Sequence, residues 1–100
     1  MTLFDLAEAE RRKEEGMARA ASARRELLAV AQGIAQELAQ RHGCVHADDV
    51  AMEMHLRGSS WEALGNAAGS VFRGMEWTGE VRQSLRPSTH GRIIRVWRLA

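Results

Sequence analysis

The stretch 74–99, GMEWTGEVRQSLRPSTHGRIIRVWRL, decides the fold because the spacing of its apolar residues changes there from helical to extended. β-Branched and aromatic residues cluster towards both of its ends, so we expect strands at about 75–83 and 92–99. Turn-forming residues separate these strands, namely Pro87, Ser88, Thr89 and Gly91. Since proline cannot occupy a central strand, Pro87 belongs to the loop, and the stretch predicts a C-terminal β-hairpin.

Helical spacing of apolar residues precedes the hairpin. Residues 23–41 form the clearest helix, because apolar side chains recur there every three or four positions along one face. The residues of this stripe are Leu27, Val30, Ala31, Ile34 and Leu38. Gly43 is a stop signal after them, since glycine accepts the left-handed backbone that commonly ends a helix.

A shorter helix is expected over residues 46–57. His46 occupies its N-cap, which predicts a weak cap. Its first turn holds two acids that favour the positive end of the helix dipole, Asp48 and Asp49. Its inward-facing residues are Val50, Ala51 and Met54.

A third helix is expected from the capping-box pair Ser59 and Glu62 to about Phe72. Gly65 and Gly69 lie inside it, and each costs about 1 kcal/mol relative to alanine in a helix interior. Because two such costs in one short helix need a reason, we expect another backbone to approach the helix closely at these glycines.

Residues 1–22 are predicted to be an N-terminal helical arm in front of a domain that covers residues 23–100. Good helix formers fill residues 3–15, but apolar residues occur only in the first two turns, and Gly16 weakens the pattern. The segment is expected to be a frayed, solvated helix or an arm that docks on a partner subunit, and both interpretations stay open.

The charge of the chain is nearly balanced overall but uneven along its length. Lys and Arg number 14 and Asp and Glu number 13, and this net charge of +1 excludes a polycation that coats nucleic acid by charge alone. Residues 81–100, however, contain no acid and five arginines, Arg82, Arg86, Arg92, Arg95 and Arg98. A basic end of this kind indicates nucleic acid as a partner or an edge strand kept soluble by charge.

Composition sets further limits on the class of protein. A chain of 100 residues with 45% hydrophobic residues is one small globular domain. It has a single cysteine, no apolar signal stretch at its start, and no apolar run near the roughly 20 residues that span a bilayer. We therefore expect a cytoplasmic protein.

Helices followed at once by a hairpin predict a mainly α fold with a C-terminal β-hairpin, namely a winged helix-turn-helix preceded by the N-terminal helical arm. In this arrangement the third helix can enter the major groove of DNA while the hairpin tip contacts phosphates. The residues predicted to bind DNA are Asn66, Ser70, Arg73, Arg82, Arg86, His90 and Arg92. The same scaffold also serves as a protein–protein module, so the fold alone does not decide the function.

Residues at the hairpin tip also have a structural interpretation, in which Pro87 and His90 fix the loop shape while the arginines stay in solvent. For Arg86 and Arg92 we expect contact with an anion, because guanidinium groups bind phosphate strongly.

The three tryptophans divide into two groups. Trp77 and Trp97 are expected in the core, because large aromatic rings bury well there. Trp61 lies near the start of the third helix and fits either the core or an exposed anchor for a partner.

Several short motifs in the C-terminal half give the chain a resemblance to a known family. They are Leu64-Gly65 in the third helix, Thr78-Gly79, the run 84–92 (SLRPSTHGR) and Val96-Trp97. In these motifs the chain resembles a group of small proteins encoded by bacteriophages and prophages, over roughly residues 24–99. The resemblance implies a winged-helix fold, a phage context and DNA binding.

Other chemistries find little support in the sequence. His42, Cys44 and His46 alternate, but their spacing matches no usual zinc pattern, so no metal is expected and Cys44 is expected to be buried. The chain offers no nucleophile with a histidine partner, no pair of converging carboxylates and no phosphate-binding glycine loop. We therefore expect neither an enzyme nor a cofactor.

Two functions follow from this reasoning. The first is binding of double-stranded DNA in a regulatory or replication role, with dimerisation through residues 2–22 adding the affinity that one small module lacks. The alternative is a phage accessory protein that inhibits or redirects a host protein complex, such as a nuclease or a defence system. Its contacts would be Trp61 and the acidic residues of the arm, Asp5, Glu8, Glu10, Glu14 and Glu15.

Overall fold

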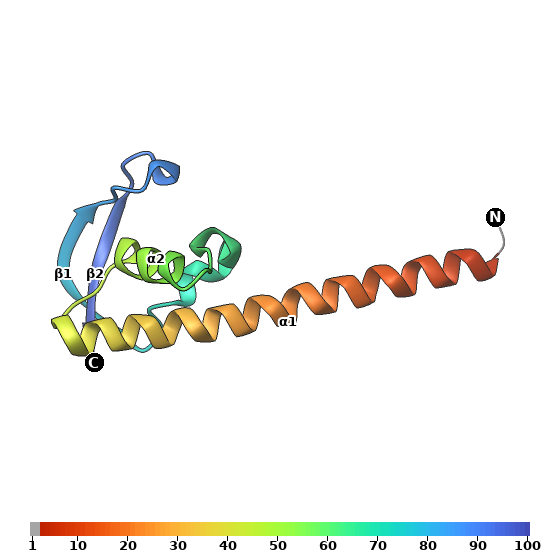
Figure 1. Cartoon of the computed structure of the whole chain (residues 1–100), viewed down its shortest axis with the longest axis horizontal. Helices are drawn as coiled ribbons and strands as arrows, with labels where there is room; N and C mark the ends of the chain where they lie inside the picture. The colour runs from red at the N-terminus through yellow and green to blue at the C-terminus, as the bar shows by residue number, and fades with distance from the viewer. Residues whose placement is uncertain (1–2) are drawn as a thin grey trace.

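A computed structural model shows a mainly helical chain that ends in a two-stranded antiparallel hairpin (Figure 1). It describes the backbone of residues 3–100 and the side chains of residues 12–13 and 16–100. The elements are the helices α1 (Leu3–His42) and α2 (Ala47–Leu56), the 3₁₀ helix η1 (Trp61–Ser70), the strand β1 (Met75–Gln83), the 3₁₀ turn η2 (Pro87–Thr89) and the strand β2 (Ile93–Leu99). The molecule measures 60 × 27 × 24 Å, and its long axis follows α1.

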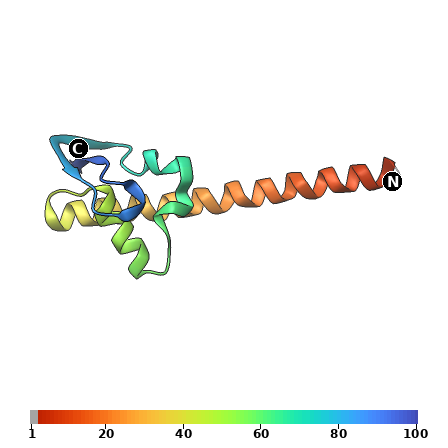
Figure 2. The same ribbon diagram turned by 90° about the horizontal axis from the view of Figure 1, so that it is seen from above.

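Helix α1 is continuous where the sequence predicted an arm and a separate helix. Its C-terminal part packs against α2, η1 and β2, while its N-terminal part extends away from the body (Figure 2). Gly16 does not interrupt it, because one glycine costs about 1 kcal/mol and strong helix formers flank it on both sides. The predicted boundary at residue 22 thus falls inside a helix, whereas the predicted stop is confirmed, since α1 ends at His42 and Gly43 has a φ of +87°.

Part of the predicted arm lies outside the described residues. The acidic side chains proposed to contact a partner, from Asp5 to Glu15, belong to it, as do the first residues of the predicted dimer segment 2–22. The described side chains of the arm, from Arg12 to Ala21, are exposed. No described helix is both long and apolar enough to cross a membrane.

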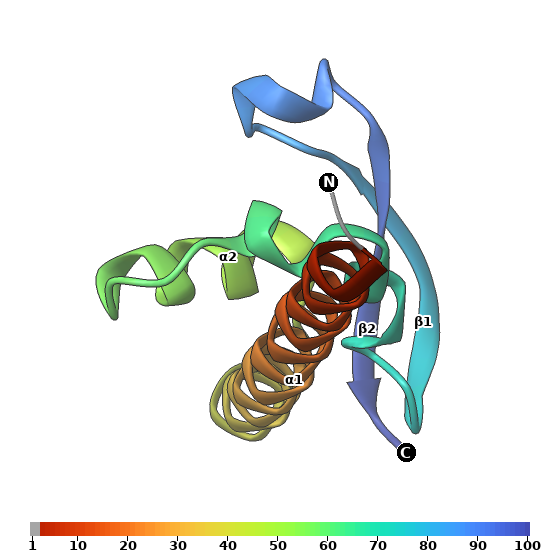
Figure 3. The same ribbon diagram turned by 90° about the vertical axis from the view of Figure 1, so that its right-hand side faces the viewer.

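The core lies between the C-terminal part of α1 and the elements that follow it, with α2 on one side of α1, the hairpin on the other and η1 between them (Figure 3). The stripe on α1 consists of Ala31, Ile34, Ala35 and Ala39. The residues packed against it include Val45, Val50, Met54, Leu64 and Val71. The predicted stripe is largely right, but Val30 lies outside it and is 47% exposed.

The start of α2 carries a reciprocal cap. The backbone N–H of Asp49 donates to Nδ1 of His46 at 3.4 Å, and the backbone N–H of His46 donates to the Asp49 carboxylate at 3.2 Å. His46 is thus the N-cap, as predicted, and both of its capping groups are engaged. This cap fixes the direction in which α2 leaves the link after α1.

Element η1 is not the α-helix that the sequence predicted. It is a 3₁₀ helix, and Gly65 inside it has φ of +55° and ψ of −132°, a conformation that only glycine adopts readily. The expected close approach of another backbone is wrong, because a Cβ added at Gly65 or Gly69 would meet no atom within 4 Å. Gly65 therefore serves to break the helix into two short pieces.

The predicted capping box at the start of this element is also wrong. The N-cap is Ser60, and its side chain makes no capping hydrogen bond. Instead, the Ser60 hydroxyl donates to the Glu62 carboxylate at 3.1 Å, which leaves Ser59 without the predicted role.

Strands β1 and β2 form the hairpin that the sequence predicted, with bounds that agree to within one residue. Met75 pairs with Leu99 at the open end, and the register shifts between Trp77 and Val81. The extra residues form a bulge in β1, with Gly79 at a φ of +88°. Bulges increase the local twist, so the hairpin curves around the body rather than standing straight.

The link between α1 and α2 forms one isolated β-bridge beside the hairpin. Val45 pairs with Trp97 of β2 through two backbone hydrogen bonds of 2.8 Å. The sheet itself has two strands, β1 and β2. The bridge ties the hairpin to the link that precedes α2.

Candidate functional site

The seven residues predicted to bind DNA fall into several places. Arg92 lines a groove between η1 and the hairpin, Arg82 lines a second groove between α2 and the hairpin, and Arg86 lines both. The other predicted residues line neither groove, namely Asn66, Ser70, Arg73 and His90. The structure thus brings together only part of the predicted set.

Two of the three residues predicted to enter the major groove belong to η1, namely Asn66 and Ser70. Arg73 lies in the turn that follows η1. Asn66 and Ser70 are four positions apart, which places them near one side of an α-helix with about 3.6 residues per turn but on different sides of a 3₁₀ helix with about three. Ser70 is also half-buried, and its carbonyl oxygen accepts a hydrogen bond of 3.0 Å from Gln32 of α1.

The carboxylate of Asp48 holds the hairpin loop against α2. It accepts hydrogen bonds from the Ser84 hydroxyl at 2.7 Å, the backbone N–H of Leu85 at 2.7 Å and Nε of Arg86 at 2.6 Å. The side chains of Asp48 and Arg86 are only 15% and 20% exposed. We call this set of contacts the Asp48 clamp. It shows that Arg86, predicted to bind an external anion, has an anion of the chain itself as its partner.

Arg86 also contacts η1 through its planar guanidinium group. The guanidinium carbon lies 5.3 Å from the centroid of a Trp61 ring, and Nη1 lies 3.8 Å from the Glu62 carboxylate. Trp61 is half-buried and packs against the core. Arg86 thus links the hairpin loop to both α2 and η1.

The clamp lowers the pKa of Asp48 below its ordinary value of 3.8. Burial alone would raise this pKa, since it disfavours the charged form. The hydrogen bonds from Ser84, Arg86 and the Leu85 backbone, together with the positive charge of Arg86, outweigh burial. The Asp48 carboxylate is therefore charged near neutral pH and stabilises the folded loop in that form.

The hairpin tip has a fixed shape of its own. Pro87 begins the turn η2, and the Thr89 hydroxyl donates to the Arg86 carbonyl oxygen at 2.8 Å. His90 ends the turn in the left-handed conformation, with φ of +52°. The structural interpretation of Pro87 and His90 is thus confirmed. Ser88 adds a hydrogen bond of 3.3 Å to Glu62, which also joins the tip to η1.

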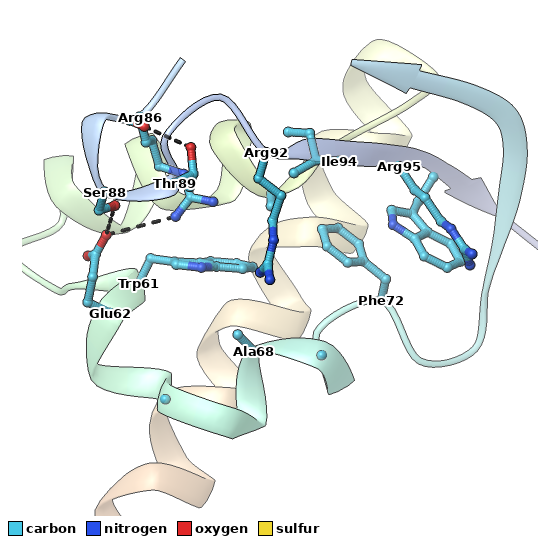
Figure 4. Close-up of a pocket in the computed structure, with 14 residues that line it drawn as sticks. Trp61, Glu62, Ala68, Phe72, Arg86, Ser88, Thr89, Arg92, Ile94 and Arg95 are labelled. Carbon is cyan, nitrogen blue, oxygen red and sulfur yellow. Dashed lines mark hydrogen bonds and ion pairs between the residues drawn. The ribbon is translucent and has the colours of Figure 1, made fainter. Parts of the chain in front are cut away.

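The groove between η1 and the hairpin has an aromatic and a basic side (Figure 4). We call it the η1–hairpin groove; its volume is about 510 Å³. Its aromatic lining consists of Trp61, Phe72 and Trp97. Phe72 and Trp97 stack on each other with centroids 5.5 Å apart and an interplanar angle of 6°. Arg92 and Arg95 of the hairpin bring positive charge to the same groove.

Carboxylates of the chain pair with two of the five arginines in residues 81–100. Asp48 pairs with Arg86, and Glu76 pairs with Arg98 at 3.1 Å. The other three, Arg82, Arg92 and Arg95, have exposed side chains and no carboxylate partner within the described part of the chain. The net positive charge available to a partner is therefore smaller than the sequence count suggests, and it lies on the hairpin.

The tryptophans differ from their predicted places in one case. Trp97 is half-buried against the core, as expected. Trp77 is 43% exposed, so its predicted place in the core is wrong. The guanidinium carbon of Arg95 lies 4.6 Å from the Trp77 ring centroid, and Nε1 of Trp77 donates to the carbonyl oxygen of Glu80 at 2.9 Å.

Cys44 and the histidines near it in the sequence are of the residue types that bind metal ions. Among the described residues, no cluster of three or more Cys, His, Asp or Glu side chains could hold a metal ion. Cys44 is exposed, so its predicted burial is wrong. In the extended link after α1, Val45 faces the core, and the alternation of side chains turns Cys44 to solvent.

Sequence reasoning missed two residues that shape this site. Asp48 was expected to serve only the helix dipole, and no sequence signal links it to Arg86, 38 residues away. Arg95 could have been found, because it lies two positions from Trp97 on β2 and residues two apart share one face of a strand.

Comparison of the chain with known protein families, with curated proteins and with solved structures found no match. The resemblance of its C-terminal half to small phage proteins therefore stays a prediction, as does the function that it implies.

Proposed function

We propose that the chain is a winged-helix protein that binds double-stranded DNA through its hairpin. The order of elements supports the fold, because two helices, a third helical element and a hairpin follow one another. The isolated bridge between Val45 and Trp97 ties this hairpin to the link between the helices. The η1–hairpin groove puts the third helical element next to the hairpin, as the winged helix requires.

One observation carries the proposed DNA binding, namely the hairpin arginines that pair with no carboxylate among the described side chains. Guanidinium groups bind phosphate oxygens through charge-assisted hydrogen bonds, and phosphate contacts supply most of the affinity of many DNA-binding proteins. Arg82 lies on β1, Arg95 lies on β2, and Arg92 immediately precedes β2 at the end of the clamped loop. The Asp48 clamp thus gives these arginines a fixed support.

This arrangement favours the DNA backbone over the base sequence. Phosphate contacts position a protein on the duplex but carry no sequence information. The side chains of η1 that could read bases do not share one side, and Asn66 is the exposed one suited to an adenine edge. We therefore propose weak dependence of affinity on DNA sequence, and no catalytic step.

A second copy of the chain would add the affinity that three arginines lack. The N-terminal part of α1 extends into solvent (Figure 1), and Met17 on it is 64% exposed. Most helical stability in proteins comes from tertiary packing, and the described side chains of the arm from Arg12 to Ala21 are exposed, so pairing of two arms along residues 2–22 would stabilise both. The proposed DNA-binding species is accordingly a homodimer.

Fluorescence anisotropy with a labelled blunt duplex at low salt tests the proposal. The double variant R92A/R95A should bind at least about tenfold more weakly than the natural chain, because two charge-assisted contacts are lost. The charge-matched control R24A/R25A removes two exposed arginines from α1 and should bind nearly as well as the natural chain. Equal losses in both double variants, or no binding by the natural chain, would refute the proposal.

An exposed apolar surface favours a protein partner as the second candidate function. Met52 of α2 is 60% exposed and Leu85 of the hairpin loop is 90% exposed, and both line the groove between α2 and the hairpin. This is the surface that a phage accessory protein could use to bind a host complex. Capture of a stoichiometric partner that survives nuclease treatment, and that is lost in M52S/L85S, would favour this function.

A further inference from the structure

The η1–hairpin groove combines two features that single-stranded nucleic acids require. Flat aromatic side chains give unpaired bases a surface on which to stack, and positive charges beside them hold the phosphates. In the groove, the stacked pair Phe72 and Trp97 and the ring of Trp61 supply the first feature. Arg92 and Arg95 supply the second, from the hairpin side of the same groove (Figure 4).

The charges in the groove favour an anionic occupant. Arg92 and Arg95 have no carboxylate partner among the described residues. The one carboxylate that lines the groove belongs to Glu62, and it already accepts hydrogen bonds from Ser60 and Ser88. Arg86 lies 3.8 Å from Glu62, but it already pairs with Asp48, so Glu62 keeps its negative charge. Arg92 and Arg95 together outweigh this one carboxylate, so the lining of the groove has a net positive charge.

The shape of the groove favours an unpaired base over a paired one. Bases inside a duplex are stacked on their neighbours, so their flat faces are not available to a protein ring. The η1 side of the groove is lined by Gly65, Ala68 and Gly69, which leave room for a nucleotide to approach the backbone. The volume of about 510 Å³ lies in the range of sites for small ligands, about 300–1,000 Å³.

We propose that the η1–hairpin groove binds an unpaired nucleotide, with its base on the aromatic lining and its phosphates on Arg92 and Arg95. This inference rests on the proposed DNA binding and names the class of DNA that binds best, a duplex that carries a single-stranded segment. The duplex lies along the hairpin arginines, and the groove takes the first unpaired nucleotide beyond it.

Binding of three DNAs to the full chain tests this inference: a blunt duplex, the same duplex with a thymidine tail, and the tail alone. Anisotropy reports affinity, and tryptophan fluorescence reports stacking. The tailed duplex should bind about 5- to 100-fold more tightly than the blunt one, which is the effect of one stacked base. It should also quench tryptophan fluorescence, whereas the blunt duplex should not.

Variants of Trp61 and Arg92 locate the effect. Trp61→Leu should abolish the advantage of the tail, and Trp61→Phe should retain much of it because an aromatic face remains. Leu56→Ala, at an exposed residue of α2 outside the groove, should keep the advantage. Because Trp61 contacts the core, thermal melting must show that its variants are folded. Arg92 is exposed, so Arg92→Ala tests the groove without disturbing the core, and it should reduce the advantage of the tailed duplex over the blunt one.

The outcomes separate this inference from the proposed function. If the blunt and tailed duplexes bind equally well to the natural chain, the inference is overturned while duplex binding stands. If only tailed or single-stranded DNA binds, the groove is supported and duplex binding is refuted. If an acidic peptide such as poly-glutamate quenches tryptophan fluorescence more strongly than the thymidine tail does, the groove binds a protein segment and the proposed nucleotide binding is overturned.

Discussion

Arg86 and Arg92 flank the same hairpin tip, yet their guanidinium groups have opposite surroundings. Arg86 is 20% exposed and donates to Asp48, whereas Arg92 is exposed and has no carboxylate partner among the described residues. Both were predicted to bind an external anion, because the sequence shows two arginines beside one loop. The difference teaches that an arginine is available to a partner only if no carboxylate from another element reaches it.

The two residues divide the tasks of the hairpin between them. Arg86 joins the loop to α2 through Asp48 and to η1 through Trp61, so it fixes where the tip lies. Arg92 lies at the start of β2 beside the η1–hairpin groove, so it can contact what enters the groove. Arg86 is thus a positioning residue, and Arg92 is a contact residue of the proposed function.

The largest expected effect is on stability, from loss of the Asp48 clamp. Asp48→Ala leaves the Arg86 guanidinium without its carboxylate and the Leu85 N–H without its acceptor, so the free energy of unfolding should fall by about 2–4 kcal/mol. Urea unfolding followed by circular dichroism measures this value. Glu80→Ala is the matched control, since Glu80 is an exposed acid of β1 and its loss should cost less than about 0.5 kcal/mol. Equal unfolding midpoints for the two variants would contradict the role given to Arg86.

The second effect is the acid sensitivity that the same clamp confers. The folded chain lowers the pKa of Asp48 below 3.8, so its carboxylate stabilises the fold at higher pH, and this contribution is lost as the pH falls below 3.8 towards the pKa of the folded chain. The difference in stability between the natural chain and Asp48→Asn should therefore be constant near neutral pH and shrink below about pH 4. Unfolding midpoints measured from pH 7 down to pH 3 check this; a difference that grows on acidification would show that the pKa is raised instead.

The smallest effect concerns binding and separates the two arginines. Arg92→Ala should weaken duplex binding by a few fold and reduce the salt slope by about one, while stability changes by less than about 0.5 kcal/mol. Arg86→Ala should do the reverse, lowering the free energy of unfolding and leaving the salt slope unchanged. Anisotropy measures the salt slope of each variant, and urea unfolding measures its free energy of unfolding. If Arg86→Ala reduced the slope and Arg92→Ala did not, the assignment of the two residues would be inverted.

The hairpin and the boundary between α1 and α2 could be predicted well, because residues close to them in the sequence determine them. The hairpin follows from residue types and from Pro87, and its bounds agree to within one residue. The ends of α1 and α2 follow from Gly43 and His46, which act on their own backbone neighbours. Each of these signals works within a few residues, so it can be read without knowing the rest of the fold.

The errors have equally local causes. Gly16 was weighed as a helix breaker, but its cost is small beside the helix formers around it, and α1 continues through it. Gly65 was weighed as a tolerated glycine, although its positive φ ends the regular helix there. Residue type alone does not distinguish these two cases, because both glycines have helix-forming neighbours and only Gly65 of the two has a positive φ.

The candidate site could be predicted only in part, because its contacts join distant residues. Asp48 and Arg86 are 38 positions apart, and their pairing depends on how α2 and the hairpin pack. The contact of Trp77 with Arg95 depends on the pairing of β1 with β2. The sequence therefore shows how many arginines the last twenty residues contain. Which of them pair with carboxylates of the chain and which face solvent depends on the tertiary structure.

The salt dependence of duplex binding by the natural chain tests the central claim most directly. If Arg82, Arg92 and Arg95 contact phosphates and the two paired arginines do not, the logarithm of affinity should fall with the logarithm of salt concentration with a slope of about −3 per bound chain. A slope of about −4.5 would mean that Arg86 and Arg98 also contact phosphates, against the division argued from their carboxylate partners. A slope near zero, or no binding at low salt, would contradict DNA binding by the hairpin altogether.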